Sequence, residues 1–161
     1  VLRDASETAA NRSIELSLDH DGNDLVLGSR GLLEILVQNL LDNACKFNRP
    51  DVPTVIDIRY RQATTAELPE FELWAEANYC VLEFADNGIG FDEAYRDKIF
   101  TIFQRLHGRS EYEGTGIGLA IVKKIVEKHN GLIGAKSREG EGAAFTIILP
   151  LYQTVSAQLP G

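Results

Sequence analysis

The spacing of apolar and polar residues predicts strands and helices in alternation along this chain. Between residues 12 and 19, Ile14, Leu16 and Leu18 alternate with polar residues, the period-two pattern of a half-buried strand. From 31 to 47 the apolar residues recur every three or four positions, which indicates a long amphipathic helix. Its apolar positions are Leu33, Leu36, Val37, Leu40, Leu41, Ala44 and Phe47.

Further elements follow from the same periods. Segments 54–61 and 79–86 are predicted strands, and the ambiguous segment 71–78 is able to pair with the second of these as a hairpin. A short helical stretch is expected at about 92–99. A second long helix is marked by Ile117, Ile121, Val122, Ile125 and Val126, with Gly131 as its C-terminal cap. Segments 132–137 and 143–150 close the chain as strands.

The order β, α, β, β, α, α, β, β predicts an α/β two-layer sandwich. Its helices are expected on one face of a mixed, mostly antiparallel sheet. The sequence shows no internal repeat or linker, so we expect one domain over 12–150, with tails at 1–11 and 151–161. Function has to be argued from sites, because a fold of this kind serves many chemistries.

Composition narrows the class of protein. Of the 161 residues, 44% are apolar, yet no apolar run approaches the ~18 residues of a membrane span, and no secretory signal is present. The net charge of −8 argues against a nucleic-acid-binding face. Cys45 and Cys80 lie in apolar segments and are expected to be buried free thiols, which fits a reducing, cytosolic compartment. The chain lacks methionine and starts at Val1, so we expect it to be part of a longer protein.

The first candidate site lies on the long helix, in "QNLLDNACKF". At 100° per residue, Asn39, Asn43 and Lys46 fall within about 60° of one another, at the border of the apolar face. Asparagine is a poor helix former, so two of them one turn apart need a reason. One is that an amide oxygen such as that of Asn43 binds Mg²⁺ while Lys46 meets a phosphate. The alternative is the solvated edge of an ordinary helix.

The second candidate site is "ADNGIGFD". Asp86 ends a buried strand, and Gly88 and Gly90 lie in the turn that follows. A carboxylate there can accept a hydrogen bond from an exocyclic amine such as that of adenine, while the glycines let a flat ring approach the backbone. The alternative is a strand-to-helix turn in which Asp86 is a turn residue and Asp92 a helix N-cap.

The third candidate site is "GTGIG", where Gly114, Gly116 and Gly118 precede the second long helix. Consecutive N–H groups without covering side chains, at the positive end of a helix dipole, form a cradle for anions and most often for phosphates. A glycine-rich hinge is the alternative.

Several other nucleotide and catalytic motifs are excluded. Leu119 stands where a dinucleotide-binding G-x-G-x-x-G would have its last glycine, and Ala135 replaces a glycine that a Walker A loop needs. No eukaryotic-type kinase motif is present. The three histidines, His20, His107 and His129, show neither metal-ligand spacing nor a neighbouring serine or cysteine nucleophile.

In this order, the three sites resemble the N, G1 and G2 boxes of the GHKL superfamily. The run "IFTIFQRLHGRSEYEGTGIGLAIVKKIVEKHNG" resembles the catalytic ATP-binding domain of bacterial sensor histidine kinases, and the similarity covers about 12–150. The resemblance implies a Bergerat fold that binds ATP and Mg²⁺. Residues 1–11 would then be a tail or the end of a linker from a dimerisation domain outside this sequence.

The resemblance also implies roles for individual residues. Asn39 and Asn43 supply the N box, with Asn43 on Mg²⁺, Lys46 on the phosphates and Phe47 near the base. Asp86 reads the adenine amine beside Gly88 and Gly90. The phosphate loop and the start of its helix comprise Gly114, Thr115, Gly116, Ile117, Gly118 and Leu119. Phe100 and Phe103 match the F box, and the lid over 104–113 offers Arg105, His107 and Arg109 to the γ-phosphate by their charge.

One position separates the branches of this superfamily. The resemblance implies that ATPase branches carry a glutamate one helical turn before the Mg²⁺-binding asparagine. In this sequence the equivalent position is occupied by Asn39. Without this base, slow hydrolysis and phosphoryl transfer are expected. The acceptor histidine of the resembled kinases lies on a separate dimerising hairpin, and no such segment is present in this sequence.

We therefore expect the catalytic domain of a histidine kinase in two-component signalling. Its expected partners are the phosphoacceptor domain of the same parent protein and a downstream response regulator, without nucleic acid or direct membrane contact. The alternatives are a GHKL ATPase that works as a clamp, and a degenerate kinase or serine-kinase-like anti-sigma module that binds a partner protein.

Overall fold

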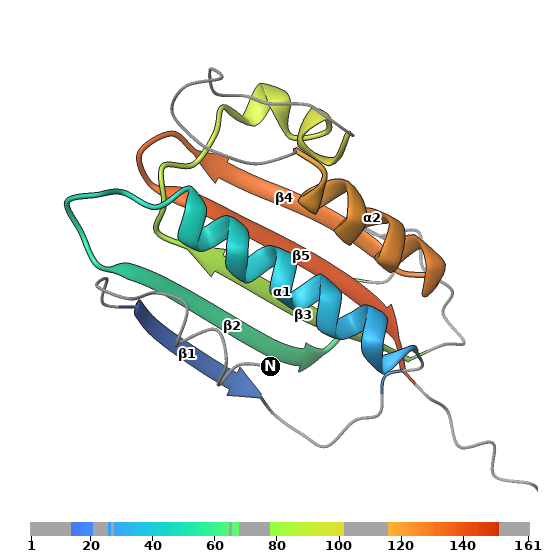
Figure 1. Cartoon of the computed structure of the whole chain (residues 1–161). Coiled ribbons are helices and arrows are strands. Elements are labelled where there is room, and N and C mark those ends of the chain that lie inside the picture. The colour runs from blue at the N-terminus through green and yellow to red at the C-terminus, as the bar shows by residue number, and fades with distance from the viewer. Residues whose placement is uncertain are drawn as a thin grey trace, which may run out of the picture.

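The computed structural model describes residues 14–20, 26, 28–64, 66–67, 78–101 and 116–151, which form two layers (Figure 1). One layer is a five-stranded sheet and the other holds two helices. The elements in chain order are β1 (Ile14–His20), α1 (Arg30–Lys46), β2 (Thr54–Gln62), β3 (Tyr79–Asp86), the 3-10 turns η2 (Glu93–Tyr95) and η3 (Lys98–Phe100), α2 (Gly118–Lys128), β4 (Leu132–Arg138) and β5 (Gly142–Pro150).

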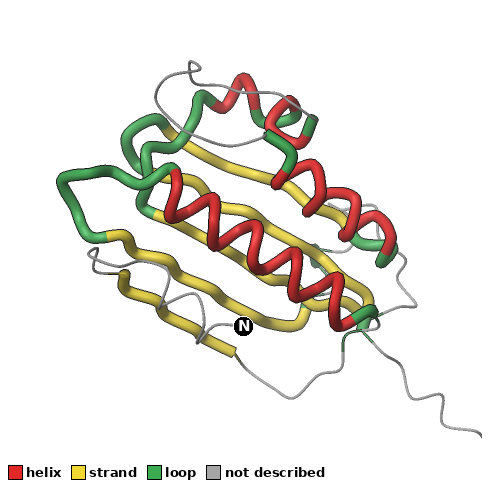
Figure 2. Tube along the Cα trace, viewed as in Figure 1, coloured by secondary structure: helices red, strands yellow, loops and turns green. Residues whose placement is uncertain are grey.

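The sheet has the strand order β1-β2-β3-β5-β4. β1 pairs with β2 in parallel, and the other three pairings are antiparallel. Both long helices lie over the same face of the sheet, in red over yellow in Figure 2. The predicted two-layer α/β sandwich with a mixed, mostly antiparallel sheet is therefore confirmed.

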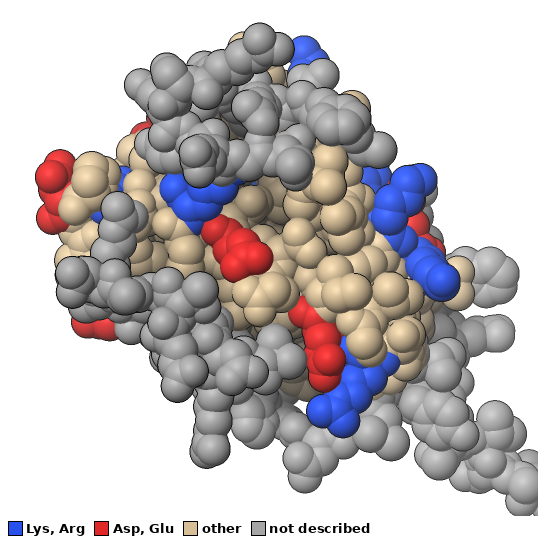
Figure 3. Space-filling model, in the orientation of Figure 1, with Lys and Arg blue, Asp and Glu red and all other residues tan. Residues whose placement is uncertain are grey.

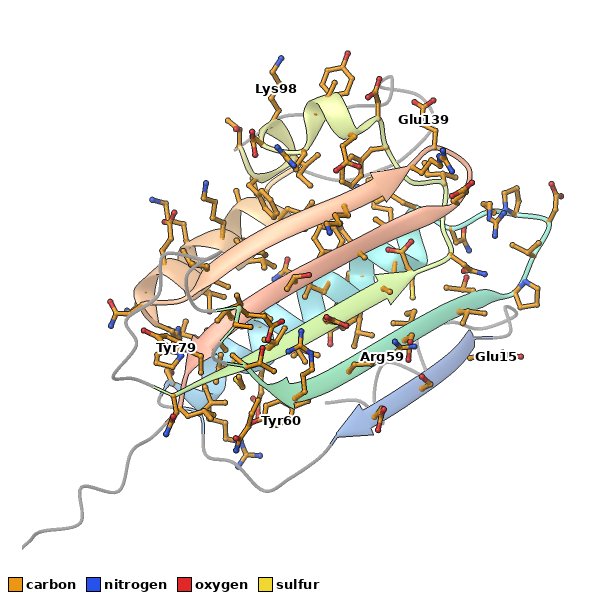
Figure 4. The ribbon with its side chains drawn as sticks, turned by 180° about the vertical axis from the view of Figure 1, so that it is seen from behind. Glu15, Arg59, Tyr60, Tyr79, Lys98 and Glu139 are labelled. Atoms are coloured by element: carbon orange, nitrogen blue, oxygen red, sulfur yellow. The ribbon has the colours of Figure 1, made fainter. Side chains whose placement is uncertain are left out.

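The core lies between the helices and this face of the sheet. The predicted apolar stripe of α1 is buried at Leu36, Leu40, Leu41 and Ala44, and that of α2 at Val122, Ile125 and Val126. The opposite side of the sheet carries exposed polar side chains such as Glu15 and Arg59 (Figure 4). A second, smaller buried cluster of Tyr79, Val81 and Ile148 lies on that opposite face of β3 and β5, so the main core and both helices are on one face while the other is buried only locally.

The segment expected to be helical at about 92–99 folds differently. It forms the two short 3-10 turns η2 and η3, and Asp92 caps the first because its Oδ1 accepts a hydrogen bond from the Ala94 N–H at 2.9 Å. The N-cap that the alternative interpretation gave to Asp92 is thus present, on a 3-10 turn. The hairpin considered for 71–78 falls, except for Asn78, outside the described residues.

The C-terminal cap of α2 also differs from the prediction. The left-handed residue is Asn130, with φ 55°, and not Gly131. The N–H groups of Asn130 and Gly131 donate to the carbonyls of Glu127 and Val126 at 3.0 and 2.9 Å, a Schellman motif. Gly131 is required for a different reason, since a Cβ atom there would lie 2.4 Å from the carbonyl oxygen of Ile148.

The two cysteines are free, as expected, but only Cys80 is buried. Cys45 is half-buried near the end of α1, and burial together with the charge of Asp42 raises the pKa of its thiol. No helix in the described part of the chain combines the length and apolar character that a bilayer span requires.

Candidate functional site

α1 presents the first group of predicted site residues. Asn39 and Asn43 lie one turn apart and are half-buried, and Lys46 ends the helix. The Nδ2 of Asn39 donates to the carbonyl of Ile35 at 2.8 Å, while the Nζ of Lys46 lies 4.8 Å from the ring centroid of Phe47. The helix thus carries two amides and one cation along the edge of its apolar face, as the spacing predicted.

The end of α1 contacts the turn that follows β3. The carbonyl oxygen of Phe47 accepts a hydrogen bond from the Ile89 N–H at 2.8 Å. A Cβ atom on Gly88 would lie 2.4 Å from that same oxygen, and one on Gly90 would lie 2.2 Å from the carbonyl oxygen of Arg138. Both glycines are therefore required by close backbone packing within the protein, in addition to any approach of a ligand, and Gly90 also adopts a positive φ of 64°.

Asp86 is the last residue of β3 and lies at the start of this turn. Its Oδ1 accepts a hydrogen bond from the Gly88 N–H at 2.8 Å, so the turn role that the alternative interpretation gave to Asp86 is present. Burial raises the pKa of the Asp86 carboxyl, against the opposite effect of hydrogen bonds from the backbone of Gly88 and Ala143. A half-buried carboxyl of this kind, at the edge of the core, is suited to recognise a donor on a ligand.

The start of α2 supplies the third group. Gly116 has a positive φ of 70°, and the helix begins at Gly118 after Ile117, whose side chain has no hydrogen-bonding group to cap the first N–H groups. The first turn contains no acidic residue. Leu119 and Gly118 are half-buried, and Gly118 faces Asn39 of α1. This helix terminus therefore keeps the N–H groups and the dipole that favour an anion.

Phe103, Arg105, His107, Arg109, Gly114 and Thr115 lie outside the described residues. Phe100 is described and is buried in the core, where its ring meets that of Phe145 edge-on at 6.4 Å. The match of Phe100 to an F box thus falls on a core residue.

Two residues that the sequence analysis did not select hold the turn after β3. Asn87 accepts from the Val55 N–H at 2.8 Å and donates to the carbonyl of Pro53 at 2.9 Å, so it ties the turn to the start of β2. Ser137 Oγ accepts from the Phe91 N–H at 2.8 Å and donates to the carbonyl of Gly142. The position of Asn87 in "DNG" is the only sequence signal for either role.

Charge on the helix-bearing face is divided among small groups. Figure 3 shows described Lys and Arg atoms beside Asp and Glu atoms, with an uncharged area between them. Among the described residues, no cluster of three His, Cys, Asp or Glu side chains is arranged to hold a metal ion.

Residues 28–153 match the family described as histidine kinase-, DNA gyrase B- and HSP90-like ATPases. The chain belongs to this ATPase family. It is 42% identical over 146 residues to cyanobacterial phytochrome A of a Nostoc species, covering 91% of this chain and 16% of that protein. It is 34% identical over 161 residues to the sensor protein kinase PmrB of Pseudomonas aeruginosa, covering 99% of this chain and 30% of PmrB.

A solved structure gives the same result for the fold. The mycobacterial sensor histidine kinase MprB superposes with a TM-score of 0.71 at 26% identity, covering 93% of this chain and 89% of that one. The expected family and fold are thereby confirmed, and the chain is a domain of the histidine-kinase type. It spans about a sixth of the phytochrome and less than a third of PmrB, and so corresponds to one part of these longer proteins.

Proposed function

We propose that the chain is the catalytic part of a sensor histidine kinase. It binds ATP·Mg²⁺ and transfers the γ-phosphoryl group to a histidine of a separate dimerising domain in the same parent protein. One observation carries this proposal. α1 contacts the turn of Asp86 through the Phe47 carbonyl and the start of α2 through Asn39, so one helix joins a base-reading group and a phosphate-binding group.

The residues present fit this ligand. The half-buried carboxyl of Asp86 is suited to accept a hydrogen bond from the adenine amine, and the N–H groups at the start of α2 are suited to the phosphates. Asn43 offers a hard amide oxygen, and Lys46 a point charge one turn away. When bound, Mg²⁺ would neutralise charge on the phosphate oxygens, and Asn43 is the residue that would hold it.

Transfer is a better proposal than hydrolysis because of Asn39. Its amide cannot act as a general base toward water, and its Nδ2 is already bonded to the Ile35 carbonyl. The acceptor is proposed to lie on another domain. His129 cannot take that role in this fold, since it is buried and both ring nitrogens have hydrogen-bond partners.

The wider context of the proposal is two-component signalling in the cytoplasm. The parent protein would pass phosphate from the acceptor histidine to a response regulator, as is expected of a sensor kinase. Residues 12–150 would form the catalytic domain, with the tails at 1–11 and 151–161 outside it. Neither nucleic acid nor direct membrane contact is needed for this activity.

The test begins with calorimetric titration of the 161-residue chain with a non-hydrolysable ATP analogue, with and without Mg²⁺. Radiolabelled ATP is then added with an isolated helical hairpin that carries the acceptor histidine. Binding that depends on Mg²⁺, followed by acid-labile and base-stable label on the hairpin, is the expected result. Steady phosphate release without labelling would replace the proposal with an ATPase clamp, and label on a partner's serine would replace it with an anti-sigma-type kinase.

A further inference from the structure

Arg49 lies three residues beyond the end of α1 and was not among the residues selected from the sequence. Its Nε donates a hydrogen bond to the carbonyl oxygen of Asn87 at 2.8 Å. Its Nη1 donates to the carbonyl oxygen of Gly140, in the turn between β4 and β5, at 3.1 Å. One side chain therefore joins three segments that are far apart in the sequence.

The three segments lie side by side at one end of the sheet. Figure 1 shows the loop after α1, the segment after β3 and the β4–β5 turn converging there, and Figure 4 marks the last of these by Glu139. The Gly140 N–H donates to the carbonyl of Ile89 at 2.7 Å. Arg49, Asn87, Ile89 and Gly140 thus form a closed ring of contacts around the turn that begins at Asp86.

We infer that Arg49 is a positioning residue for the adenine end of the nucleotide site, an inference that rests on the proposed function. Arg49 contacts the residue directly after Asp86 and, through Gly140, the residue directly after Gly88. It therefore sets where the Asp86 carboxyl and the Gly88 backbone meet a flat base. Arg49 does not itself touch the base in this assignment.

The chemistry of the side chain explains why an arginine is needed. A guanidinium is a rigid planar fork whose N–H groups point in fixed directions, so it can bond two separate carbonyl oxygens at once. A lysine ammonium keeps the charge but has no such fork, and it cannot hold both carbonyls in the same geometry. Replacement by lysine should therefore weaken the positioning in part, and replacement by alanine should remove it.

The experiment compares adenosine and a non-hydrolysable ATP analogue as ligands of the wild-type chain, Arg49→Ala and Arg49→Lys. Because Arg49 acts at the base end, Arg49→Ala should raise the Kd of both ligands by the same factor, about tenfold, and Arg49→Lys by less. Gly118→Ala, at the phosphate end, should raise the Kd of the ATP analogue and not that of adenosine. Arg30→Ala is the matched control, since Arg30 is exposed and pairs with Glu34.

A purely structural role predicts a different outcome. In that case Arg49→Ala would lower the thermal midpoint while the Kd of the folded variant stayed at the wild-type value, and this result would overturn the inference. Faster amide exchange at Gly88 and Ile89 is expected in addition. If Arg49→Ala does not fold, Arg49→Lys is tested in its place, and a wild-type Kd for that variant would overturn the inference. Failure of the wild-type chain to bind adenosine or the ATP analogue would count against the proposed function and not against Arg49.

Discussion

A Cβ atom on Gly118 would lie 3.1 Å from Oδ1 of Asn39, so the first residue of α2 lies directly against the middle of α1. This distance is shorter than most contacts that Cβ atoms make in proteins. The absence of a side chain at 118 therefore lets the start of α2 approach the amide of Asn39. Two of the three boxes expected from the sequence meet at this contact.

Gly118→Ala should weaken binding of an ATP analogue several-fold with little loss of stability. Alanine is a better helix former than glycine, by up to roughly 1 kcal/mol in a helix interior and less at this first helical position, which offsets part of the crowding of the flexible Asn39 side chain. The added methyl group would nevertheless displace that amide and narrow the space for phosphates. Calorimetry and urea denaturation measure the two effects. Gly134→Ala is the control because no atom lies within 4 Å of its added Cβ, and an unchanged affinity in Gly118→Ala would contradict the phosphate role.

Asn43→Asp should reduce the affinity for the ATP analogue at least tenfold in the presence of Mg²⁺. The substitution keeps the shape of the side chain but places a negative charge beside the phosphates, while the half-buried position on α1 tolerates the carboxylate. Far-UV circular dichroism should show an unchanged fold. Asn78→Asp makes the same change at an exposed position before β3 and should leave the affinity unaltered. Wild-type affinity in Asn43→Asp would remove Asn43 from the proposed site.

The sequence predicted those parts of the fold that depend on local pattern. The stripe on α1 and the strand that ends at Asp86 were both found from periods of 3.6 and 2, because burial of one face leaves that signature. The strand order and the short 3-10 turns were not found. They depend on contacts between distant segments, about which periodicity carries no information.

In the candidate site too, contacts between residues far apart in the chain were not predicted from the sequence. Gly88 and Gly90 were selected because glycine lets a ligand approach the backbone. In the structure, a side chain at 88 would clash with the carbonyl of Phe47, and one at 90 would clash with the carbonyl of Arg138. Phe47 is 41 residues from Gly88 in the chain, and Arg138 is 48 residues from Gly90. Arg49 was not selected for the same reason. Its partners are backbone carbonyl oxygens of distant residues, which every residue type carries, so no sequence pattern indicates them.

Asp86→Asn should stabilise the fold more at pH 7 than at pH 4. Burial raises the pKa of Asp86 in the folded chain, so ionisation costs stability. This cost begins as the pH rises past the unfolded pKa, about 3.9, and is complete above the folded pKa. Asparagine cannot ionise and removes it. Urea denaturation across this range measures the difference, with exposed Asp51→Asn as control. A difference that does not change with pH would contradict the prediction.

Asp86→Asn should also lose affinity for adenosine, because an amide can present an N–H₂ group where the ligand needs an acceptor. Greater stability together with weaker binding would identify Asp86 as a residue kept for function at a cost in stability. Unchanged binding of adenosine would remove Asp86 from the adenine site, whatever the effect on stability.

Glu67→Gln should show the opposite dependence on pH. A hydrogen-bonded pair with Arg61, at 2.7 and 2.9 Å, together with the Thr64 N–H lowers the pKa of Glu67 to about 2. The stabilisation is therefore present above the unfolded pKa, about 4.3, and is lost as the pH falls toward 2. The difference between variant and wild type should be largest at neutral pH and become small as the pH falls to 2. Glu83→Gln, whose carboxylate lies 3.5 Å from the same guanidinium, should have a smaller effect.

His129→Ala should lower the free energy of unfolding by about 2–4 kcal/mol. His129 caps the C-terminal end of α2, where its Nδ1 lies 2.6 Å from the Ile125 carbonyl and its Nε2 accepts the Ser29 N–H, at the start of α1, at 2.9 Å. The acceptor role of Nε2 requires that Nδ1 carry the proton and donate to Ile125. Alanine would leave a cavity and an unsatisfied N–H group at the ends of both helices.

The measurement for His129 is urea denaturation at neutral pH, with Lys128→Ala as the control because Lys128 is the exposed neighbour in the last turn of α2. The control should change stability by less than about 0.5 kcal/mol. Gly28→Ala should act through the same contact, since its Cβ would lie 2.3 Å from Cδ2 of His129. If His129→Ala and Lys128→Ala were equally mild, the contact between the start of α1 and the end of α2 would not contribute to stability, and the packing of the two helices would depend on their apolar stripes alone.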